Sequence, residues 1–394
     1  MTQEKFRQTA DQVLQQNVGR FGGSPGVVAM ATDRSGNIYE GAAGKRELGK
    51  DAPMTKDSVF AIFSTTKALC GVTVMQLVEE GKIKLSDPAK AYVPEIAELQ
   101  VLTGFDASGQ PQTRPPKRDI TINDLMLHTS GLCYEFFSAD DLKYRTAKNI
   151  PTVVSCTFAS IRTVLLHDPG ERWTYGANID WLGRIVEQQR GKRLGEVMKE
   201  RLFAPLEMND IAFTMSDSMK ARRATIHDRA ADGKLTPLPD LALPQPPEMD
   251  CGGHGLYASV GDYMKFIRMM LNDGAGPKGR VLKAETVAAM AQDGLGKLPC
   301  TGWTTSIPSL SNDGEFFPGI DKGWAYTFMT NREDAPTGRP AGSLAWAGLA
   351  NCFYWIDRKN GIGGYWASQI LPFQDAVSYP GFVEFETAVY QHCT

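Results

Sequence analysis

The chain has 394 residues, of which 42% are hydrophobic and 22% are charged, and its formal net charge is −3. This composition is typical of a globular protein with enough apolar residues for a large core. Because the net charge is small and no basic cluster occurs, neither nucleic acid nor an anionic membrane is expected as a partner. The N-terminal residues are polar and do not form a secretory signal, so we expect a cytoplasmic protein.

The first half of the chain begins with a helix, over residues 3–18. Gly26–Thr32 and Ile38–Gly44 have the composition of two strands joined by a hairpin turn. Ser58–Phe63 is a further strand, and it leads into an apolar helix that ends near Gly81. The apolar stretch Val59–Val78 is long enough to span a membrane, but polar residues near its middle favour a strand followed by a core helix.

Helical patterns dominate the middle of the chain. We predict helices over Ile120–His128, Ile179–Arg190 and Leu194–Leu202. The segment Leu235–Pro247 contains five prolines, so we predict an irregular loop there, which could wall a pocket.

Strand patterns return after about residue 250. The predicted strands are Gly323–Met329, Leu344–Ala350, Cys352–Asp357 and Gly364–Ile370, and a closing helix is predicted over Phe382–His392. Strands at both ends with helices between them predict an α+β fold, an antiparallel sheet built from both termini and flanked by helices, with a mostly helical domain inserted into it. We expect residues 1–84 and 250–394 to form the sheet domain and residues 85–249 the inserted domain.

The helix that follows the third strand carries the first candidate site. The run Ala68–Glu80 leaves almost no polar face, so this helix is expected to be buried nearly all round. If the helix starts at Ser64, Ser64 and Lys67 lie three residues apart on one face, and the helix N-terminus favours negative charge beside Ser64. These features are those of a serine nucleophile, although a Ser-x-x-Lys match alone could also be a helix cap.

A second candidate lies far along the sequence. Tyr175 is in a turn that follows Pro169-Gly170 and immediately precedes a predicted helix. It could handle protons for Ser64, or it could simply pack against the start of that helix.

Four blocks taken together resemble the serine β-lactamase and penicillin-binding-protein superfamily, and within it the class C-like family VIII carboxylesterases. The blocks are Ser64-Thr65-Thr66-Lys67, Leu127-His128-Thr129-Ser130-Gly131-Leu132, Tyr175 after Pro169-Gly170, and Gly252-Gly253-His254-Gly255-Leu256. The resemblance implies an α/β sandwich with a helical insertion. It also implies Ser64 as nucleophile, Lys67 and Tyr175 as the proton-handling pair, the backbone N–H groups of Ser64 and Leu349 as oxyanion donors, and Trp346 with Gly348 at the acyl pocket.

The sequence departs from the β-lactamase pattern at two places. Asn178 comes one position later than the Tyr-x-Asn motif requires, and the Lys-Thr-Gly strand is replaced by Trp346-Ala347-Gly348. Without that lysine, recognition of a β-lactam carboxylate is not expected, and an uncharged ester fits better.

A rival serine lies in Gly22-Gly23-Ser24-Pro25-Gly26, which matches the Gly-x-Ser-x-Gly signature of α/β-hydrolases. That signature requires a strand-to-helix turn and a backbone N–H after the serine, whereas Pro25 has no N–H and a strand follows. We therefore interpret Ser24 as a turn residue.

The histidines and cysteines do not predict a metal site. Structural roles are expected for His128 and His254, neither of which has a metal partner at ligand spacing, although His254 could border the site. Seven cysteines without a Cys-x-x-Cys pair predict free, buried thiols. No metal or cofactor is expected.

The sequence thus predicts a serine carboxylesterase that cleaves small-molecule esters through a Ser64 acyl-enzyme, with at most weak β-lactam hydrolysis. In this prediction Lys67 and Tyr175 lower each other's pKa. An acyltransferase with the same acyl-enzyme, an amide hydrolase of the β-lactamase or D-amino-peptidase type, and a non-catalytic binding or scaffold protein remain alternatives. The oligomeric state is not predicted.

Overall fold

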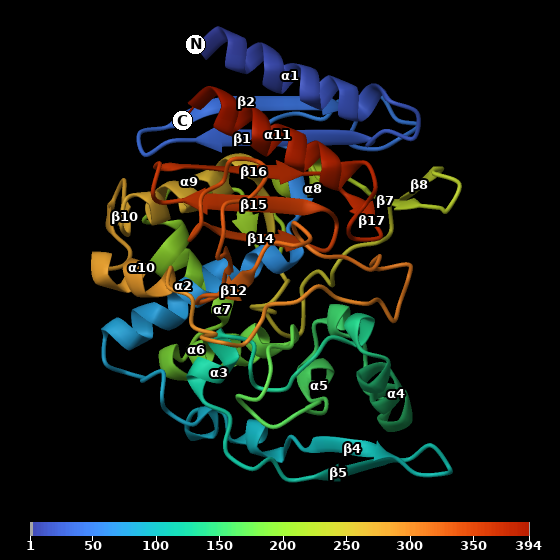
Figure 1. Cartoon of the computed structure of the whole chain (residues 1–394), viewed down its shortest axis with the longest axis vertical. Coiled ribbons are helices and arrows are strands. Elements are labelled where there is room, and N and C mark those ends of the chain that lie inside the picture. The colour runs from blue at the N-terminus through green and yellow to red at the C-terminus, as the bar shows by residue number, and fades with distance from the viewer. Residues whose placement is uncertain (1–2, 394) are drawn as a thin grey trace.

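The computed structural model describes residues 3–393. Its centre is a seven-stranded sheet in the order β12-β13-β14-β15-β16-β1-β2, with all neighbours antiparallel. These strands are β1 (Gly26–Thr32), β2 (Asn37–Gly44), β12 (Lys322–Trp324), β13 (Met329–Asn331), β14 (Leu344–Gly348), β15 (Cys352–Asp357) and β16 (Ile362–Ala367). Because β1 pairs with β16, both ends of the chain build one sheet (Figure 1). The predicted fold class is confirmed.

Helices cover both faces of this sheet. The terminal helices α1 (Gln3–Gly19) and α11 (Ser378–Cys393) lie together on the outer face, and α9 (Val260–Leu271) packs on the opposite face (Figure 1). Tyr39 of β2 joins the outer layer, since its ring lies 5.7 Å from Phe6 and 5.6 Å from Phe385 between ring centroids. The predicted terminal helices and the β1-β2 hairpin are therefore confirmed.

The segment between the two parts of the sheet contains more helix than strand, with long irregular connections. Its helices are α3 (Ile122–Met126), α4 (Ala139–Lys148), α5 (Phe158–Ile161), α6 (Asn178–Arg190), α7 (Leu194–Met198) and α8 (Asp217–Ala221), and α10 (Ala284–Met290) follows α9. A short hairpin of β4 (Val101–Phe105) and β5 (Pro111–Arg114) lies at its far end (Figure 1). The segment thus has more residues in helices than in strands, and a mostly helical inserted domain with boundaries at 84/85 and 249/250 remains a prediction.

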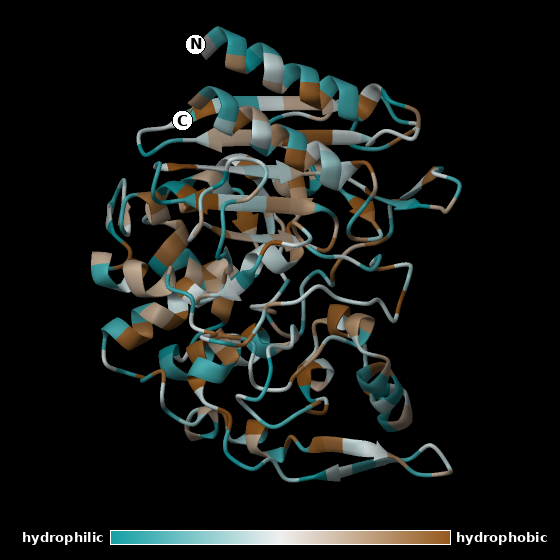
Figure 2. Ribbon diagram, viewed as in Figure 1, coloured by the Kyte–Doolittle hydropathy of each residue, from teal (hydrophilic) through white to brown (hydrophobic). Residues whose placement is uncertain are grey.

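The core helix α2 (Thr66–Glu79) follows β3 (Val59–Ala61), as the sequence predicted. Residues Thr66 to Leu77 of α2 are all buried, and the helix packs against α6. Hydrophobic residues are frequent along α2 and the sheet, whereas the peripheral helices α1 and α4 are mainly hydrophilic (Figure 2). Within residues 3–393, every helix falls short of the length or the apolar character needed to cross a membrane.

The predicted irregular loop at Leu235–Pro247 was partly wrong, because β8 (Leu235–Leu238) pairs with β7 (Ile226–Arg229). These strands form a small sheet in the order β17-β7-β8, with β17 (Ile370–Leu371), so β8 lies at its edge. An edge strand tolerates Pro237 because one side of it needs no N–H donor. The remainder of the segment has no regular secondary structure.

The predicted strand over Gly323–Met329 was also wrong in detail. The structure has two strands, β12 and β13, which are joined by a tight turn in which Ala325 N–H donates to Phe328 O at 2.7 Å. The apolar run hides this turn because Phe328 and Ala325 are themselves buried. The remaining elements are the sheet of β3, β9 (Tyr257–Ser259) and β6 (Ile211–Ala212), and the pair β10 (Ala275–Gly276) and β11 (Gly279–Arg280).

Candidate active site

Ser64 lies in a single 3-10 turn, Phe63–Thr65, between β3 and α2. The prediction that the helix starts at Ser64 was therefore wrong by two residues. Phe63 has a φ of 42°, a left-handed conformation that is strained for a residue with a side chain. Hydrogen bonds hold the turn: Tyr263 OH donates to Thr65 O at 2.8 Å, and Thr65 Oγ1 donates to Ile62 O at 2.9 Å. The candidate nucleophile thus lies in a turn that is fixed by hydrogen bonds on both of its sides.

Lys67 is fully buried, and its ammonium nitrogen lies within hydrogen-bond distance of three oxygens. Nζ is 3.1 Å from Ser64 Oγ, 3.0 Å from Tyr134 OH and 2.7 Å from Gly253 O. The predicted contact between Ser64 and Lys67 is therefore present. Burial lowers the pKa of Lys67 to about 7, although the negative charge of Asp180 opposes part of this shift. An amine with that pKa can accept a proton near neutral pH.

Tyr175 approaches Ser64 separately from Lys67. Its hydroxyl interacts with the Ser64 side chain and accepts a hydrogen bond from Trp346 Nε1 at 2.8 Å. Lys67 Nζ does not meet this hydroxyl but lies over the ring, 4.6 Å from its centroid. Burial raises the pKa of Tyr175, so the predicted lowering was wrong. A phenol with a raised pKa stays protonated and is suited to donate a proton.

Residues of the Leu127–Leu132 block and of α6 form a hydrogen-bonded group that packs against the Tyr175 ring. The His128 ring lies 4.8 Å from the Tyr175 ring, and its Nδ1 is 2.9 Å from Asn178 Nδ2. Ser130 Oγ donates in turn to Asn178 Oδ1 at 2.5 Å. Burial lowers the pKa of His128 well below its usual value, so a neutral imidazole accepts from the Asn178 amide. His128 thus packs against the Tyr175 ring, Asn178 holds His128, and neither residue lines the cavity described next.

A cavity of about 230 Å³ opens beside Ser64 and Tyr175. Seven of its sixteen described lining residues are aromatic, and the others are small, apolar or neutral polar ones. The aromatic lining residues are Phe136, Phe137, Trp173, Tyr175, Trp303, Trp346 and Phe373. No charged side chain belongs to the lining formed by residues 3–393, and none of the lining residues comes from the segment 235–247. The cavity is therefore suited to a neutral, largely apolar group.

The end of β14 passes very close to the Ser64 turn. A Cβ atom at Gly348 would lie 2.2 Å from the backbone oxygen of Ile62, so only glycine permits this approach. As a result Gly348 and Leu349 line the same cavity as Ser64. This is the arrangement that the predicted pair of oxyanion donors requires, and their role remains a proposal.

Ser24 lies elsewhere. It is 2% exposed, in the connection between α1 and β1, and its Oγ has no hydrogen-bond partner in the described part of the chain. It is absent from the cavity lining. These observations agree with the interpretation of Ser24 as a turn residue.

Two groups at the site were missed from the sequence. Tyr134 OH and the Gly253 carbonyl both contact Lys67 Nζ. Tyr134 follows the Leu127–Leu132 block by two residues, and Gly253 lies within the Gly252–Leu256 block, so the blocks contained a signal. Neither contact could be inferred without the fold, because the partners are 67 and 186 residues from Lys67.

The Trp346 hydrogen bond gives a testable prediction. Replacing Trp346 by Phe removes the Nε1 donor to Tyr175 OH while retaining an aromatic wall, and we expect kcat for ester turnover to fall about tenfold. Trp303→Phe is the matched control, because Trp303 lines the same cavity but donates to Ser311 Oγ and Asn312 O. Steady-state kinetics check the pair. Equal kcat values for the two variants would mean that the hydrogen bond has no role.

Comparison with known proteins assigns the chain to a family. The Beta-lactamase family model matches residues 11–383. The chain is 34% identical over 286 residues to Acyltransferase mokF of Monascus pilosus, covering 70% of this chain and 68% of that protein. It is 31% identical over 366 residues to Lovastatin esterase of Penicillium rubens, covering 88% and 89% of the two chains.

A solved structure agrees with this assignment. The structure of the LovD6 mutant of simvastatin synthase from Aspergillus terreus superimposes with a TM-score of 0.84 at 27% identity. The match covers 97% of this chain and 96% of the other. The chain therefore belongs to the β-lactamase family, within the serine β-lactamase and penicillin-binding-protein superfamily.

Proposed function

We propose that this protein forms an acyl-enzyme on Ser64 and transfers the acyl group to an alcohol, with hydrolysis of carboxylic esters as the competing reaction. The observation that carries the proposal is the uncharged aromatic cavity beside Ser64, Lys67 and Tyr175. The relatives include an acyltransferase and an esterase, and serine acyl-enzyme chemistry is common to both reactions. The sequence alone favoured hydrolysis as the main reaction, whereas the relatives support transfer better.

Acylation begins at the 3.1 Å contact between Ser64 and Lys67. Neutral Lys67 Nζ takes the proton of Ser64 Oγ, and Oγ forms a bond to the carbonyl carbon of the ester. The negative charge that develops on the carbonyl oxygen is stabilised by the backbone N–H groups of Ser64 and Leu349. The bond to the leaving alcohol then breaks, and the leaving oxygen receives a proton from the Tyr175 hydroxyl. Lys67 keeps the proton that it took from Ser64, because its Nζ lies over the Tyr175 ring and not beside the hydroxyl, and it returns this proton to Ser64 Oγ in deacylation.

Deacylation is the reverse sequence with a new nucleophile. An acceptor hydroxyl enters the position of the leaving alcohol, loses its proton to the same pair and attacks the acyl carbon. Ser64 Oγ leaves and is reprotonated, so no net proton is consumed. Water in the same position gives hydrolysis.

The cavity wall favours an apolar acceptor over water. The lining combines aromatic side chains with a few hydroxyl groups, and an apolar alcohol gains from burial against the aromatic part at about 25 cal/mol per Å² of apolar surface. Transfer is therefore expected to exceed hydrolysis when a bulky apolar alcohol is present.

The same wall argues against efficient β-lactam hydrolysis. A β-lactam antibiotic carries a carboxylate, and the described cavity lining offers no cationic side chain to pair with it. Benzylpenicillin turnover is therefore expected to be far slower than turnover of a short-chain p-nitrophenyl ester by the same preparation. Comparable kcat/KM values for the two substrates would contradict this prediction.

Product partition tests the proposal. The enzyme is incubated with a p-nitrophenyl acyl ester, with and without a bulky apolar alcohol, and acid and new ester are quantified. We expect new ester in proportion to the acceptor, at the expense of free acid. Formation of acid alone at every acceptor concentration would leave carboxylesterase as the function, and the absence of both products would refute acyl-enzyme chemistry.

A further inference from the structure

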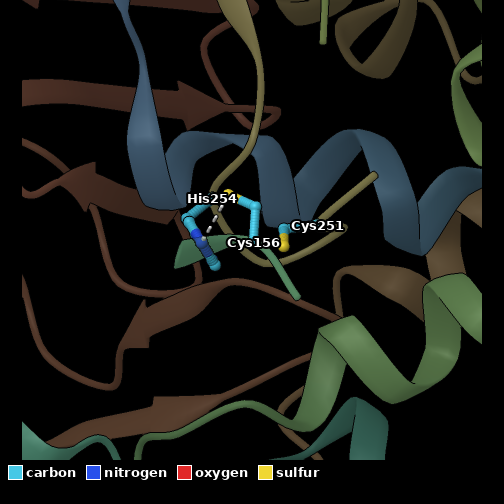
Figure 3. A group of neighbouring side chains, drawn as sticks. All are labelled: Cys156, Cys251 and His254. Atoms are coloured by element: carbon cyan, nitrogen blue, oxygen red, sulfur yellow. Dashed lines mark hydrogen bonds between the residues drawn. The ribbon is translucent and has the colours of Figure 1, made fainter. Parts of the chain in front are cut away.

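Outside the cavity lining, three buried side chains converge from two distant segments of the chain. They are Cys156, Cys251 and His254, and their ligand atoms all lie within 4.8 Å of one another. Figure 3 shows them gathered beside α2, with a dashed contact between Cys156 and His254. None of the three lines the cavity, and the proposed acyl transfer uses none of them.

The separations between the three side chains are compatible with a bound metal ion. Cys156 Sγ is 3.6 Å from His254 Nε2, a weak thiol contact, and the Cys251 thiol lies 3.6 Å from Met249 O and also interacts with the Cys156 side chain. In a tetrahedral zinc site, bonds of about 2.3 Å to sulfur and about 2.0 Å to nitrogen place those two ligands roughly 3.6 Å apart. The Cys156 and His254 pair already has this separation.

We propose that Cys156, Cys251 and His254 form a binding site for one thiophilic divalent cation of the Zn²⁺ class. A set of two thiolates and one imidazole binds Zn²⁺ in preference to hard cations such as Mg²⁺ and Ca²⁺. Binding breaks two S–H bonds and forms two metal–sulfur bonds, and the two protons are released to solvent, so no oxidant or reductant is needed. These side chains supply three ligands, and no fourth cysteine, histidine or carboxylate of the described residues joins the group.

Asp180 on α6 supplies the outer contact that such a site requires. A metal-bound histidine usually donates its other ring N–H to a carboxylate, which fixes the ring. Asp180 Oδ1 is 3.6 Å from His254 Nδ1 and accepts a hydrogen bond from Gly253 N–H at 2.9 Å. Both His254 Nδ1 and Asp180 Oδ2 are buried and lack a hydrogen-bond partner among the described residues. A small shift of the ring would therefore let His254 Nδ1 donate a hydrogen bond to the Asp180 carboxylate.

The site would connect the metal to the candidate base. Gly253, whose carbonyl accepts from Lys67 Nζ at 2.7 Å, lies between the proposed ligands Cys251 and His254. A cation that fixes both neighbours also fixes this carbonyl, and with it the position of Lys67. The cation is thus a structural element behind the base, and it takes no part in bond making or breaking at the ester.

Metal analysis of the untagged full-length protein tests the proposal. The protein is produced in Zn²⁺-supplemented medium, freed of loosely bound metal by gel filtration, and analysed by inductively coupled plasma mass spectrometry. We expect close to one zinc per chain in the unsubstituted protein and almost none in Cys156→Ser or Cys251→Ser. Cys393→Ser, which removes a partly exposed thiol on α11, is the control and should keep its zinc.

A second readout does not depend on the folding of a variant. Production in Co²⁺-supplemented medium should give the unsubstituted protein a thiolate-to-cobalt charge-transfer absorption. Zinc-free protein without that absorption would overturn the proposal. So would equal zinc in Cys156→Ser and the unsubstituted protein, or a Cys156–Cys251 disulfide found by peptide mapping in place of metal.

Discussion

Ser64→Ala is expected to abolish acyl-enzyme formation and ester turnover. Removal of Oγ leaves Lys67 and Tyr175 without the group that both contact. Loss of the nucleophile in serine hydrolases costs roughly 10⁶-fold in kcat, and the activity that remains comes from binding and oxyanion stabilisation. The fold should be retained, because Ser64 lies at the surface of the cavity and the hydrogen bonds of the turn are made by its neighbours. Kinetics with a p-nitrophenyl ester and labelling with a fluorophosphonate probe measure the effect.

Ser24→Ala is the matched control, because Ser24 is the other serine in a hydrolase-like motif. It should keep near-normal turnover and probe labelling. If Ser24→Ala were the inactive variant, or if Ser64→Ala still carried the probe, the assignment of the nucleophile would fail. Failure of the unsubstituted protein to take up the probe would favour a non-catalytic member of the superfamily.

Lys67→Met is expected to lower kcat/KM by about 10²- to 10⁴-fold, the usual contribution of a general base. Methionine fills the buried volume without offering a lone pair at the position of Nζ. Lys67→Gln serves as a second variant, since its amide can still donate to the Gly253 carbonyl. Circular dichroism and thermal melting verify that both variants fold. Near-normal kcat/KM in a folded Lys67→Met protein would exclude Lys67 as the base.

The pH profile gives an independent test of the same role. Burial lowers the pKa of Lys67 to about 7. Only the neutral amine accepts a proton, so kcat/KM should rise from acid pH and level off above about pH 7, with about a tenfold loss per pH unit below that pKa. This rise of kcat/KM between acid and neutral pH, the acidic limb of the profile, should be absent in Lys67→Met. A limb that persists unchanged in this variant would belong to another group.

The sequence predicted the parts of the site that are local or that match motifs. The i, i+3 spacing of Ser64 and Lys67 brings their side chains together even though the helix starts two residues later than expected. The sheet built from both termini followed from strand patterns at each end, because short runs of β-branched and aromatic residues bounded by turns indicate strands locally.

The contacts that the sequence did not predict are set by tertiary packing. The Trp346 to Tyr175 hydrogen bond joins residues 171 positions apart. The direction of the Tyr175 pKa shift was predicted wrongly, because Lys67 approaches the face of the ring and the aromatic surroundings of the phenol could not be seen in the sequence. The spacing rule for metal ligands likewise could not find Cys156, because it reaches Cys251 and His254 only through the fold.

The most direct test of the acyl-transfer proposal is mass spectrometry of the protein during turnover. Intact protein incubated with an excess of a slowly released acyl ester should gain one acyl mass, located by peptide mapping on the peptide that contains Ser64. Addition of a bulky apolar alcohol should then speed loss of the acyl group and yield the corresponding ester. An acyl adduct on any other residue, or loss at the same rate with and without the alcohol, would contradict the proposal.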